Sequence, residues 1–391
     1  MNIRSALRWL AAALILASSL ARAEPGVTAH SIKIGMFAPM TGGAAIFGEF
    51  TVGALAYYRM INAEGGVHGR SIQVDLVDSA CNPETTVAAV RKLVDQDKVF
   101  ALHAGVCTAD VMAVKKSLLQ QGIPFMNLGA AGASLTDPLA ANLFSALPNT
   151  NVVGRTLVDF AMSRPGTRRV AVISHPDDWG KSQLATALER LRSKYHLDFV
   201  ANVTMERGTT DITPQILTLR QAHPDVVLAF LYPADTAIFV RAAHEYGLDT
   251  PMLGSFGALY EDTVKRVGDP AATRKLFIFH ALRAPATSPQ LQRWADVIRK
   301  YGPANAPIND YSLSGMAGAQ AVVEALKRAG PQPTRKAFIH ELDSLRDYDP
   351  GLLAGPISFT STDHAGVKQG AMLTTLDGHV VSVQSWPAQE R

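Results

Sequence analysis

Short apolar runs alternate with longer amphipathic segments along most of the chain. The pattern opens with an apolar strand at residues 31–37, a turn at Thr41-Gly42-Gly43, a helix at residues 47–63 and a second strand at residues 71–78. Together these elements form a βαβ unit, in which the glycine turn exposes backbone amides beside the positive end of a helix. The unit predicts a crevice that suits an anion.

The same alternation continues to residue 280 and predicts parallel sheets covered by helices on both faces. Further apolar strands are expected at residues 99–103, 123–126, 169–174, 199–204, 226–230, 252–253 and 276–280. Helices follow at residues 290–300, 311–328 and 334–341, and β character returns at residues 357–359, 368–374 and 379–383. Asp377-Gly378 indicates a hairpin turn in this tail. A second βα array begins near Asn149, so we expect two similar α/β lobes.

The first 23 residues have the features of an export signal. Arg4 and Arg8 precede an apolar stretch at residues 10–20, and Ala21-Arg22-Ala23 fits a cleavage site. The stretch is too short to span a bilayer, and no cysteine beside the cleavage site offers a lipid anchor. We therefore expect an exported, periplasmic protein cleaved after Ala23. The alternative is a signal that is retained as a membrane anchor.

The composition is that of an ordinary globular protein, with 47% apolar and 18% charged residues. The net charge is only +3, and no basic run is interleaved with aromatic residues. A nucleic-acid partner is therefore not expected.

The chain has two cysteines, Cys81 and Cys107. They follow the second and third predicted strands, and adjacent parallel strands bring their C-terminal loops together. In an oxidising compartment this placement favours a disulfide. A reactive thiol is the alternative, although neither cysteine has an activating base beside it in the sequence.

No catalytic, cofactor-binding or metal-binding motif is recognisable. Gly180-Lys181-Ser182 resembles the end of a phosphate loop, but His175 stands where that loop needs a glycine. The eleven histidines are scattered without metal-ligand spacing. We therefore expect no catalytic residues, no cofactor and no metal, and binding is favoured over catalysis. An enzyme that uses a cleft for hydrolysis is the alternative.

Two strand-to-helix junctions are candidate ligand sites. At Cys107-Thr108, Thr108 is expected to cap a helix, with free amides and a hydroxyl near its positive end. At Gly129-Ala130-Ala131-Gly132, small residues leave the backbone open to close approach. In parallel sheets both junctions lie at the carboxyl ends of strands, where ligands gather. Simple capping and turn formation are the alternative interpretation of each junction.

Several segments together resemble the periplasmic substrate-binding proteins of ABC transporters, in the leucine/isoleucine/valine-binding branch. The resemblance covers about residues 32–383, and the placement of Cys107 as the family's second disulfide cysteine adds to it. Its landmarks are Pro39-Met40-Thr41-Gly42, Ile61-Asn62-Ala63-Glu64-Gly65-Gly66-Val67-His68-Gly69 and Asp78-Ser79-Ala80-Cys81-Asn82-Pro83.

The resemblance implies two Rossmann-like lobes with parallel sheets, joined by a three-crossover hinge and closing on a ligand (the type I periplasmic binding fold). The crossovers are expected near Pro148, near His280-Ala281 and near Gly355-Pro356. Lobe 1 would then contain residues 24–148 and 282–354, and lobe 2 residues 149–281 and 355–391. A monomer that meets membrane permease subunits is implied as well.

The resemblance also places the ligand between the lobes. Thr108, with the small residues after the next strand, matches the positions that bind a carboxylate, and aromatic residues match the positions that enclose the rest of the ligand. The expected ligand-binding residues are Phe47, Cys107, Thr108, Gly129, Ala130, Ala131, Trp179, Tyr232 and Phe256.

Two positions depart from the amino-acid binders. Ala131 replaces a threonine that contacts the ligand, and Phe256 stands at the place of the acid that pairs with the α-ammonium. We therefore expect a small carboxylate without an α-ammonium, such as an aromatic or branched hydrophobic acid. The alternative is an amino acid or amide whose ammonium is held elsewhere, for example by Asp235 or Glu261.

Overall fold

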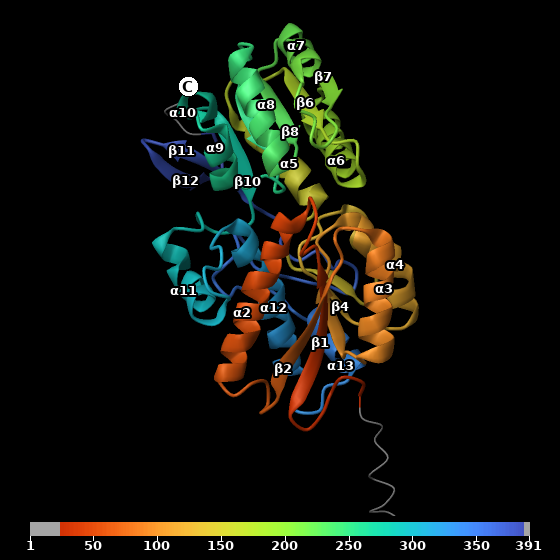
Figure 1. The fold of residues 1–391 in the computed structure, drawn as a ribbon. Coiled ribbons are helices and arrows are strands. Elements are labelled where there is room, and N and C mark those ends of the chain that lie inside the picture. The colour runs from red at the N-terminus through yellow and green to blue at the C-terminus, as the bar shows by residue number, and fades with distance from the viewer. Residues whose placement is uncertain (1–23, 387–391) are drawn as a thin grey trace, which may run out of the picture.

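The computed structural model describes residues 24–386, which form two α/β lobes, one above the other in Figure 1. The predicted export signal, residues 1–23, lies outside the described residues. Among the residues that the structure describes, no helix is both long and apolar enough to cross a membrane.

Lobe 1 is built on a five-stranded parallel sheet in the order β2-β1-β3-β4-β5. Its strands are β1 (Ser31–Ala38), β2 (Ser71–Asp78), β3 (Ala101–Ala104), β4 (Phe125–Asn127) and β5 (Leu143–Ser145). The helices of this lobe are α2 (Glu49–Ala63), α3 (Pro83–Arg91), α4 (Thr108–Gln120), α11 (Gln292–Tyr301), α12 (Asp310–Arg328) and α13 (Arg335–Asp343). Short helical turns η2 (Ala45–Gly48), η3 (Lys92–Gln96), η4 (Ala133–Leu135) and η5 (Pro289–Leu291) complete it.

Alternate residues of the lobe 1 strands face two different helix layers. Met36 on β1 belongs to a core that includes residues of α2 and α12, whereas its neighbour Phe37 packs with residues of α3 and α4. Helices α2 and α12 meet at two glycines: a Cβ atom at Gly53 would overlap the backbone of Ser312, and one at Gly315 would overlap the backbone of Phe50. This close approach brings the start of α12 next to the start of α2.

Lobe 2 is built on a seven-stranded sheet in the order β12-β11-β10-β9-β8-β6-β7. Its strands are β6 (Val170–Ser174), β7 (Phe199–Thr204), β8 (Val226–Phe230), β9 (Met252–Gly254), β10 (Leu276–His280), β11 (Ala371–Leu376) and β12 (His379–Val383). The helices are α5 (Thr150–Ser163), α6 (Asp178–Tyr195), α7 (Thr213–Gln221), α8 (Pro233–Glu245), α9 (Tyr260–Val267) and α10 (Pro270–Thr273). Strands β6 to β10 are parallel, and β11 and β12 join antiparallel as a hairpin. The predicted turn at its tip has positive φ at both Asp377 and Gly378.

The structure confirms the α/β class and most of the predicted elements, with four differences. The sequence pattern does not mark α3, α10 or β5. The strand predicted at residues 357–359 is wrong, because only Ile357 pairs there, in an isolated bridge to Tyr348.

Three segments cross between the lobes, as the family resemblance implies, but the third lies later than expected. The first follows β5 at residues 146–149 and the second follows β10 at residues 281–283. The boundary predicted near Gly355-Pro356 is wrong, because residues 357–367 still belong to lobe 1. The Gly366 amide donates to the Ser145 carbonyl, and the rings of Phe144 and Phe359 are 5.2 Å apart. The crossing therefore lies at residues 368–370, directly before β11.

Candidate functional site

A cavity of about 340 Å³ lies between the lobes, at the carboxyl ends of strands from both sheets. Parallel sheets gather ligands at this edge, because loops and helix N-termini converge there. The lining residues are Phe47, Phe50, Cys81, Val106, Cys107, Thr108, Ala109, Gly129, Ala131, Asp177, Asp178, Trp179, Arg207, Tyr232, Phe256, Gly257 and Tyr311.

Eight of the nine residues expected at the ligand site line this cavity, and Ala130 does not. The Ala130 amide donates to the Gly105 carbonyl and to Asn127 Oδ1, and its carbonyl accepts from Asn127 Nδ2. These bonds turn Ala130 into the interior of lobe 1. The cavity is reached instead by its neighbours, Gly129 and Ala131.

The lobe 1 side of the cavity presents the uncapped N-terminus of α4. Thr108 is the first residue of this helix rather than its cap: Cys107 occupies the cap position, with extended backbone and no side-chain cap hydrogen bond. The Thr108 hydroxyl accepts from the Gly132 amide at 3.2 Å. In the part of the chain that the structure describes, the Ala131 amide has no hydrogen-bond partner. Free amides at a positive helix end suit a carboxylate.

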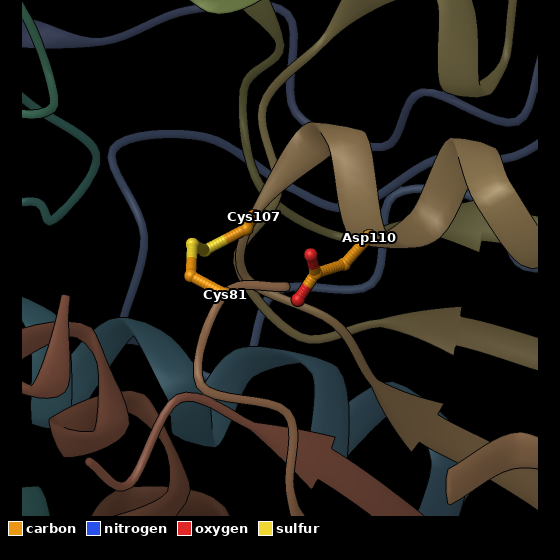
Figure 2. A group of neighbouring side chains, drawn as sticks. All are labelled: Cys81, Cys107 and Asp110. Atoms are coloured by element: carbon orange, nitrogen blue, oxygen red, sulfur yellow. A yellow bond between two sulfur atoms is a disulfide. The ribbon is translucent and has the colours of Figure 1, made fainter. Parts of the chain in front are cut away.

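A disulfide fixes this helix start. Cys81, after β2, is bonded to Cys107, with Cα atoms 5.7 Å apart, so the predicted pairing is confirmed. Figure 2 shows the carboxylate of the fully buried Asp110 beside the two sulfur atoms. Burial raises the pKa of Asp110. Within residues 24–386 these three side chains are the one group close enough to share a metal ion, but the disulfide removes the thiolates that would bind it.

Aromatic rings from both lobes enclose the cavity. In lobe 2, Trp179 stacks on Tyr232 with centroids 4.5 Å apart. Phe47 of lobe 1 meets Tyr232 edge-on at 5.3 Å, and Phe50 of lobe 1 meets Phe256 of lobe 2 at 6.3 Å. Flat and apolar ligand bodies fit such walls.

Tyr311, at the start of α12, holds the lobes together. Its hydroxyl donates to the Gly257 carbonyl of lobe 2 at 2.6 Å, and its ring stacks on Phe50 at 5.0 Å. Burial raises the pKa of Tyr311, so the hydroxyl keeps its proton. Gly257 has no space for a Cβ atom, which would meet the Trp179 ring at 2.6 Å. The lobes are therefore in direct contact around the cavity.

Three charged residues of lobe 2 also line the cavity. Asp177 caps α6 by accepting from the Gly180 amide at 2.8 Å and pairs with Arg207. The Arg207 guanidinium lies 4.3 Å above the Tyr232 ring and donates to its hydroxyl at 2.8 Å. Asp178, the first residue of α6, is exposed and has no hydrogen-bond or ion-pair partner among the described residues.

The acids suggested by the sequence as ammonium partners lie elsewhere. Asp235 is buried, with Oδ2 3.2 Å from His175 Nε2 and Oδ1 accepting from the Gly208 amide. Glu261 lies in the first turn of α9, where burial raises its pKa. Neither carboxylate lines the cavity.

The sequence alone does not mark several lining residues. From the sequence, Asp177 and Asp178 are interpreted as solvated residues at a helix start, and Phe50 and Tyr311 as ordinary helix residues. One signal does point to Arg207: it follows the carboxyl end of β7, where ligands of parallel sheets gather. The lining residues that were not expected from the sequence are Phe50, Cys81, Val106, Ala109, Asp177, Asp178, Arg207, Gly257 and Tyr311.

Comparison with known families matches residues 31–379 to the family described as "Periplasmic binding protein". The chain belongs to the periplasmic binding protein family. This is a family of binding proteins, not of enzymes.

Relatives carry different ligands. The binding protein is 26% identical over 318 residues to an amino acid binding protein of Pseudomonas aeruginosa, across 80% of this chain and 83% of the relative. It superimposes with a TM-score of 0.81 on a branched-chain amino acid ABC transporter protein of Thermus thermophilus with bound valine, at 21% identity and 90% and 95% coverage. A solute-binding protein of R. palustris in complex with 4-hydroxybenzoate gives a TM-score of 0.76 at 20% identity and the same coverage.

Proposed function

We propose that this binding protein is exported to the periplasm, binds a small hydrophobic carboxylic acid without an α-ammonium group, and delivers it to the membrane subunits of an ABC importer. One observation carries the ligand class. The cavity combines an uncapped α4 N-terminus with aromatic walls, and it has Phe256 at the position where the family resemblance implies an acidic partner for the α-ammonium.

The α4 side supplies the carboxylate contacts. Thr108 and Ala109, the first two residues of α4, line the cavity, and among the described residues no basic side chain of lobe 1 lines it. Backbone donors at a helix start bind a carboxylate without a counter-ion. The relatives with valine and with 4-hydroxybenzoate support this assignment, since both ligands carry a carboxylate.

The Phe256 side disfavours an ammonium. Phe256 is 6% exposed and packs edge-on against Phe50 and Phe279. Burying an ammonium without a carboxylate costs several kcal/mol, whereas micromolar affinity corresponds to only about 8 kcal/mol. An aromatic or branched apolar group gains free energy in the same place.

A thermal-shift screen tests the proposal. The protein is unfolded and refolded to release any co-purified ligand, then screened against branched and aromatic acids and against the common amino acids. A ligand at ~100 times its Kd stabilises the fold by about 2.7 kcal/mol. We expect the largest shifts from the acids. Shifts from leucine or valine, with none from the acids, would overturn the proposed ligand class.

Asp178 favours a second candidate, an amino acid held by its ammonium. This carboxylate lines the cavity and has no hydrogen-bond or ion-pair partner among the described residues. If it holds an ammonium, Asp178→Asn will abolish amino-acid binding and leave binding of simple acids unchanged. Asp95→Asn, which removes an exposed charge from lobe 1 outside the cavity lining, is the matched control.

A further inference from the structure

Arg207 brings unused hydrogen-bond donors into the ligand cavity. Its Nη2 serves both Asp177 and the Tyr232 hydroxyl, but Nε and Nη1 donate to no group in the part of the chain that the structure describes. The side chain is 51% exposed, and its guanidinium carbon lies 4.3 Å from the centre of the Tyr232 ring. Arg207 is therefore oriented by Asp177 and Tyr232, while three of the five N–H donors of its guanidinium remain available.

A buried polar pair fixes the loop that carries Arg207. His175 Nδ1 lies 2.7 Å from the Met205 carbonyl, which only accepts, so Nδ1 carries a proton. Asp235 accepts from the Gly208 amide at 3.0 Å and lies 3.2 Å from His175 Nε2. The residues on either side of the Glu206-Arg207 pair are thus tied to the same His175–Asp235 pair. Both of these side chains are almost fully buried.

The same pair also contacts Tyr232, the ring that lies beneath the guanidinium. The His175 ring stacks on Tyr232 with centroids 5.1 Å apart, and the Tyr232 amide lies 3.3 Å from His175 Nε2. Exposed arginines ordinarily remain free to move. The contacts of His175 and Asp235 restrict Arg207 instead, which is expected if Arg207 binds a ligand. Binding residues are commonly held in place by a second layer of buried hydrogen-bonding side chains, and the His175–Asp235 pair has this position behind Arg207.

The surrounding charges indicate what Arg207 contacts. Asp177 already pairs with the guanidinium, and the unpaired Asp178 carboxylate lines the same cavity. An additional carboxylate on the ligand would face both of these negative charges. An uncharged oxygen, such as a hydroxyl or carbonyl, accepts from Nε or Nη1 without that repulsion.

We propose that Arg207 is the specificity residue of lobe 2 and donates to an uncharged oxygen of the ligand other than its carboxylate, with His175 and Asp235 as its positioning residues. The favoured ligands are hydrophobic acids that carry a hydroxyl or carbonyl group on their apolar body. This inference rests on the proposed function, because lobe 1 must hold the carboxylate.

Calorimetry with two series of near-isosteric acids tests the role of Arg207. One series is 3-(4-methylphenyl)propanoate, 3-(4-hydroxyphenyl)propanoate and 3-(4-carboxyphenyl)propanoate. The other is heptanoate, 6-hydroxyhexanoate and heptanedioate. In at least one series we expect the hydroxy acid to bind about tenfold more tightly than the methyl and dicarboxylate analogues.

Arg207→Met should remove this preference, so that the ratio of hydroxy-acid to methyl-acid affinity falls about tenfold, to about one. Arg220→Met, which changes an arginine of α7 that bonds the Tyr246 carbonyl outside the cavity, should keep the preference. Equal weakening of all acids by Arg207→Met would instead mean that Arg207 holds the carboxylate and would overturn the inference. The inference is also overturned if the dicarboxylates bind more tightly than the other acids. Failure of every acid to bind overturns the proposed function itself, whereas binding without a preference overturns only the role of Arg207.

The positioning role has a separate readout. Asp235→Asn keeps the shape of the side chain but removes the charge beside His175 Nε2. The ratio of hydroxy-acid to methyl-acid affinity should fall several-fold while the methyl acid still binds. An unchanged ratio in a folded Asp235→Asn variant would show that the pair does not position Arg207.

Discussion

Single residues decide which end of a ligand each lobe can hold. Thr108 adds a hydroxyl to the amides at the start of α4, and Phe256 places an apolar ring on the opposite lobe. The two positions are complementary. A negative charge on the ligand strengthens binding at the start of α4, whereas a positive charge beside Phe256 weakens it. The proposed ligand class rests on this contrast more than on any single contact.

Replacing Thr108 by valine should weaken acid binding by about tenfold to 100-fold. The change keeps the side-chain shape but removes one hydroxyl, and a hydrogen bond to a charged group contributes about 1.5–3 kcal/mol. Titration calorimetry with 4-methylpentanoate measures the effect. Thr218→Val, which removes a hydroxyl bonded to the Pro214 carbonyl on α7, is the control and should leave the affinity unchanged. Unaltered affinity in Thr108→Val would contradict the placement of the carboxylate.

At this scale the sequence predicts residues that follow a local pattern better than residues brought in from a distance. Thr108, Gly129 and Trp179 lie at strand-to-helix junctions, and the family resemblance identifies them. Tyr311 enters the site only because α12 packs closely on α2, far away in the sequence. The pairing of Asp177 with Arg207 likewise depends on the neighbouring positions of β6 and β7 in the sheet.

Helix α4 is held at its start by a bond to another loop. Its N-terminus has no side-chain cap, and the disulfide to Cys81 fixes its first turn to the loop after β2. The free amides are therefore held in place by a covalent bond instead of by a capping side chain. If α4 holds the ligand as proposed, the disulfide supports both ligand binding and fold stability.

Removal of the disulfide by Cys81→Ser with Cys107→Ser should lower the free energy of unfolding by about 3–4 kcal/mol, because the closed loop spans 26 residues. Denaturant titration measures this loss. The affinity for 4-methylpentanoate should fall in the same variant, since the first turn of α4 gains freedom. A stability loss with unchanged affinity would show that α4 does not need the bond to present its amides.

The prediction of strands succeeds where the run of apolar residues is long. It fails where strand pairing depends on residues far away in the sequence. Strand β8 is apolar and buried at every position, and its predicted bounds agree with the structure. Residues 357–359 have similar local character, but Phe359 packs against Phe144 and only Ile357 forms a bridge. The segment at 357–359 is shorter and has a serine at its centre, and a strand forms there only if a neighbour offers a continuous edge.

The whole molecule brings buried carboxyl groups together where its lobes meet. Asp310 of α12 and Glu261 of α9 come from opposite lobes, and burial, together with the nearby Glu261, raises the pKa of Asp310. His280 Nδ1 lies 3.8 Å from Asp310 Oδ2, but burial lowers the pKa of His280 to about 3, so the ring is neutral. Tyr311, the next residue, is also held neutral by burial. Asp310 thus has no cationic partner among the described residues.

Asp310→Asn should therefore stabilise the protein increasingly as pH rises. A carboxyl with a raised folded pKa contributes full stability below its unfolded pKa of about 4 and loses it as pH rises through the folded value. Asparagine does not ionise and avoids this loss. Thermal unfolding at pH 5 and at pH 8 should show a larger gain over the parent at pH 8. Asp95→Asn should show no such trend, and an equal gain at both pH values would contradict the assignment of Asp310.

The two-lobe architecture is largely predictable, because alternating strands and helices and the family landmarks both indicate it. The third crossing is not, since residues 357–367 return to lobe 1 through contacts with β5 that only the folded chain reveals. Direct contact between the lobes at Tyr311 and Gly257 is equally hidden in the sequence.

The central claim is that the cavity accepts a carboxylate and rejects an α-ammonium, and calorimetry of matched pairs tests it most directly. The refolded protein is titrated with 4-methylpentanoate and leucine, and with 3-phenylpropanoate and phenylalanine, which differ only in the α-ammonium. We predict that at least one acid binds about 100-fold or more tightly than its amino acid, which corresponds to about 2.7 kcal/mol. Leucine or phenylalanine binding as tightly as the matching acid, or more tightly, would contradict the account.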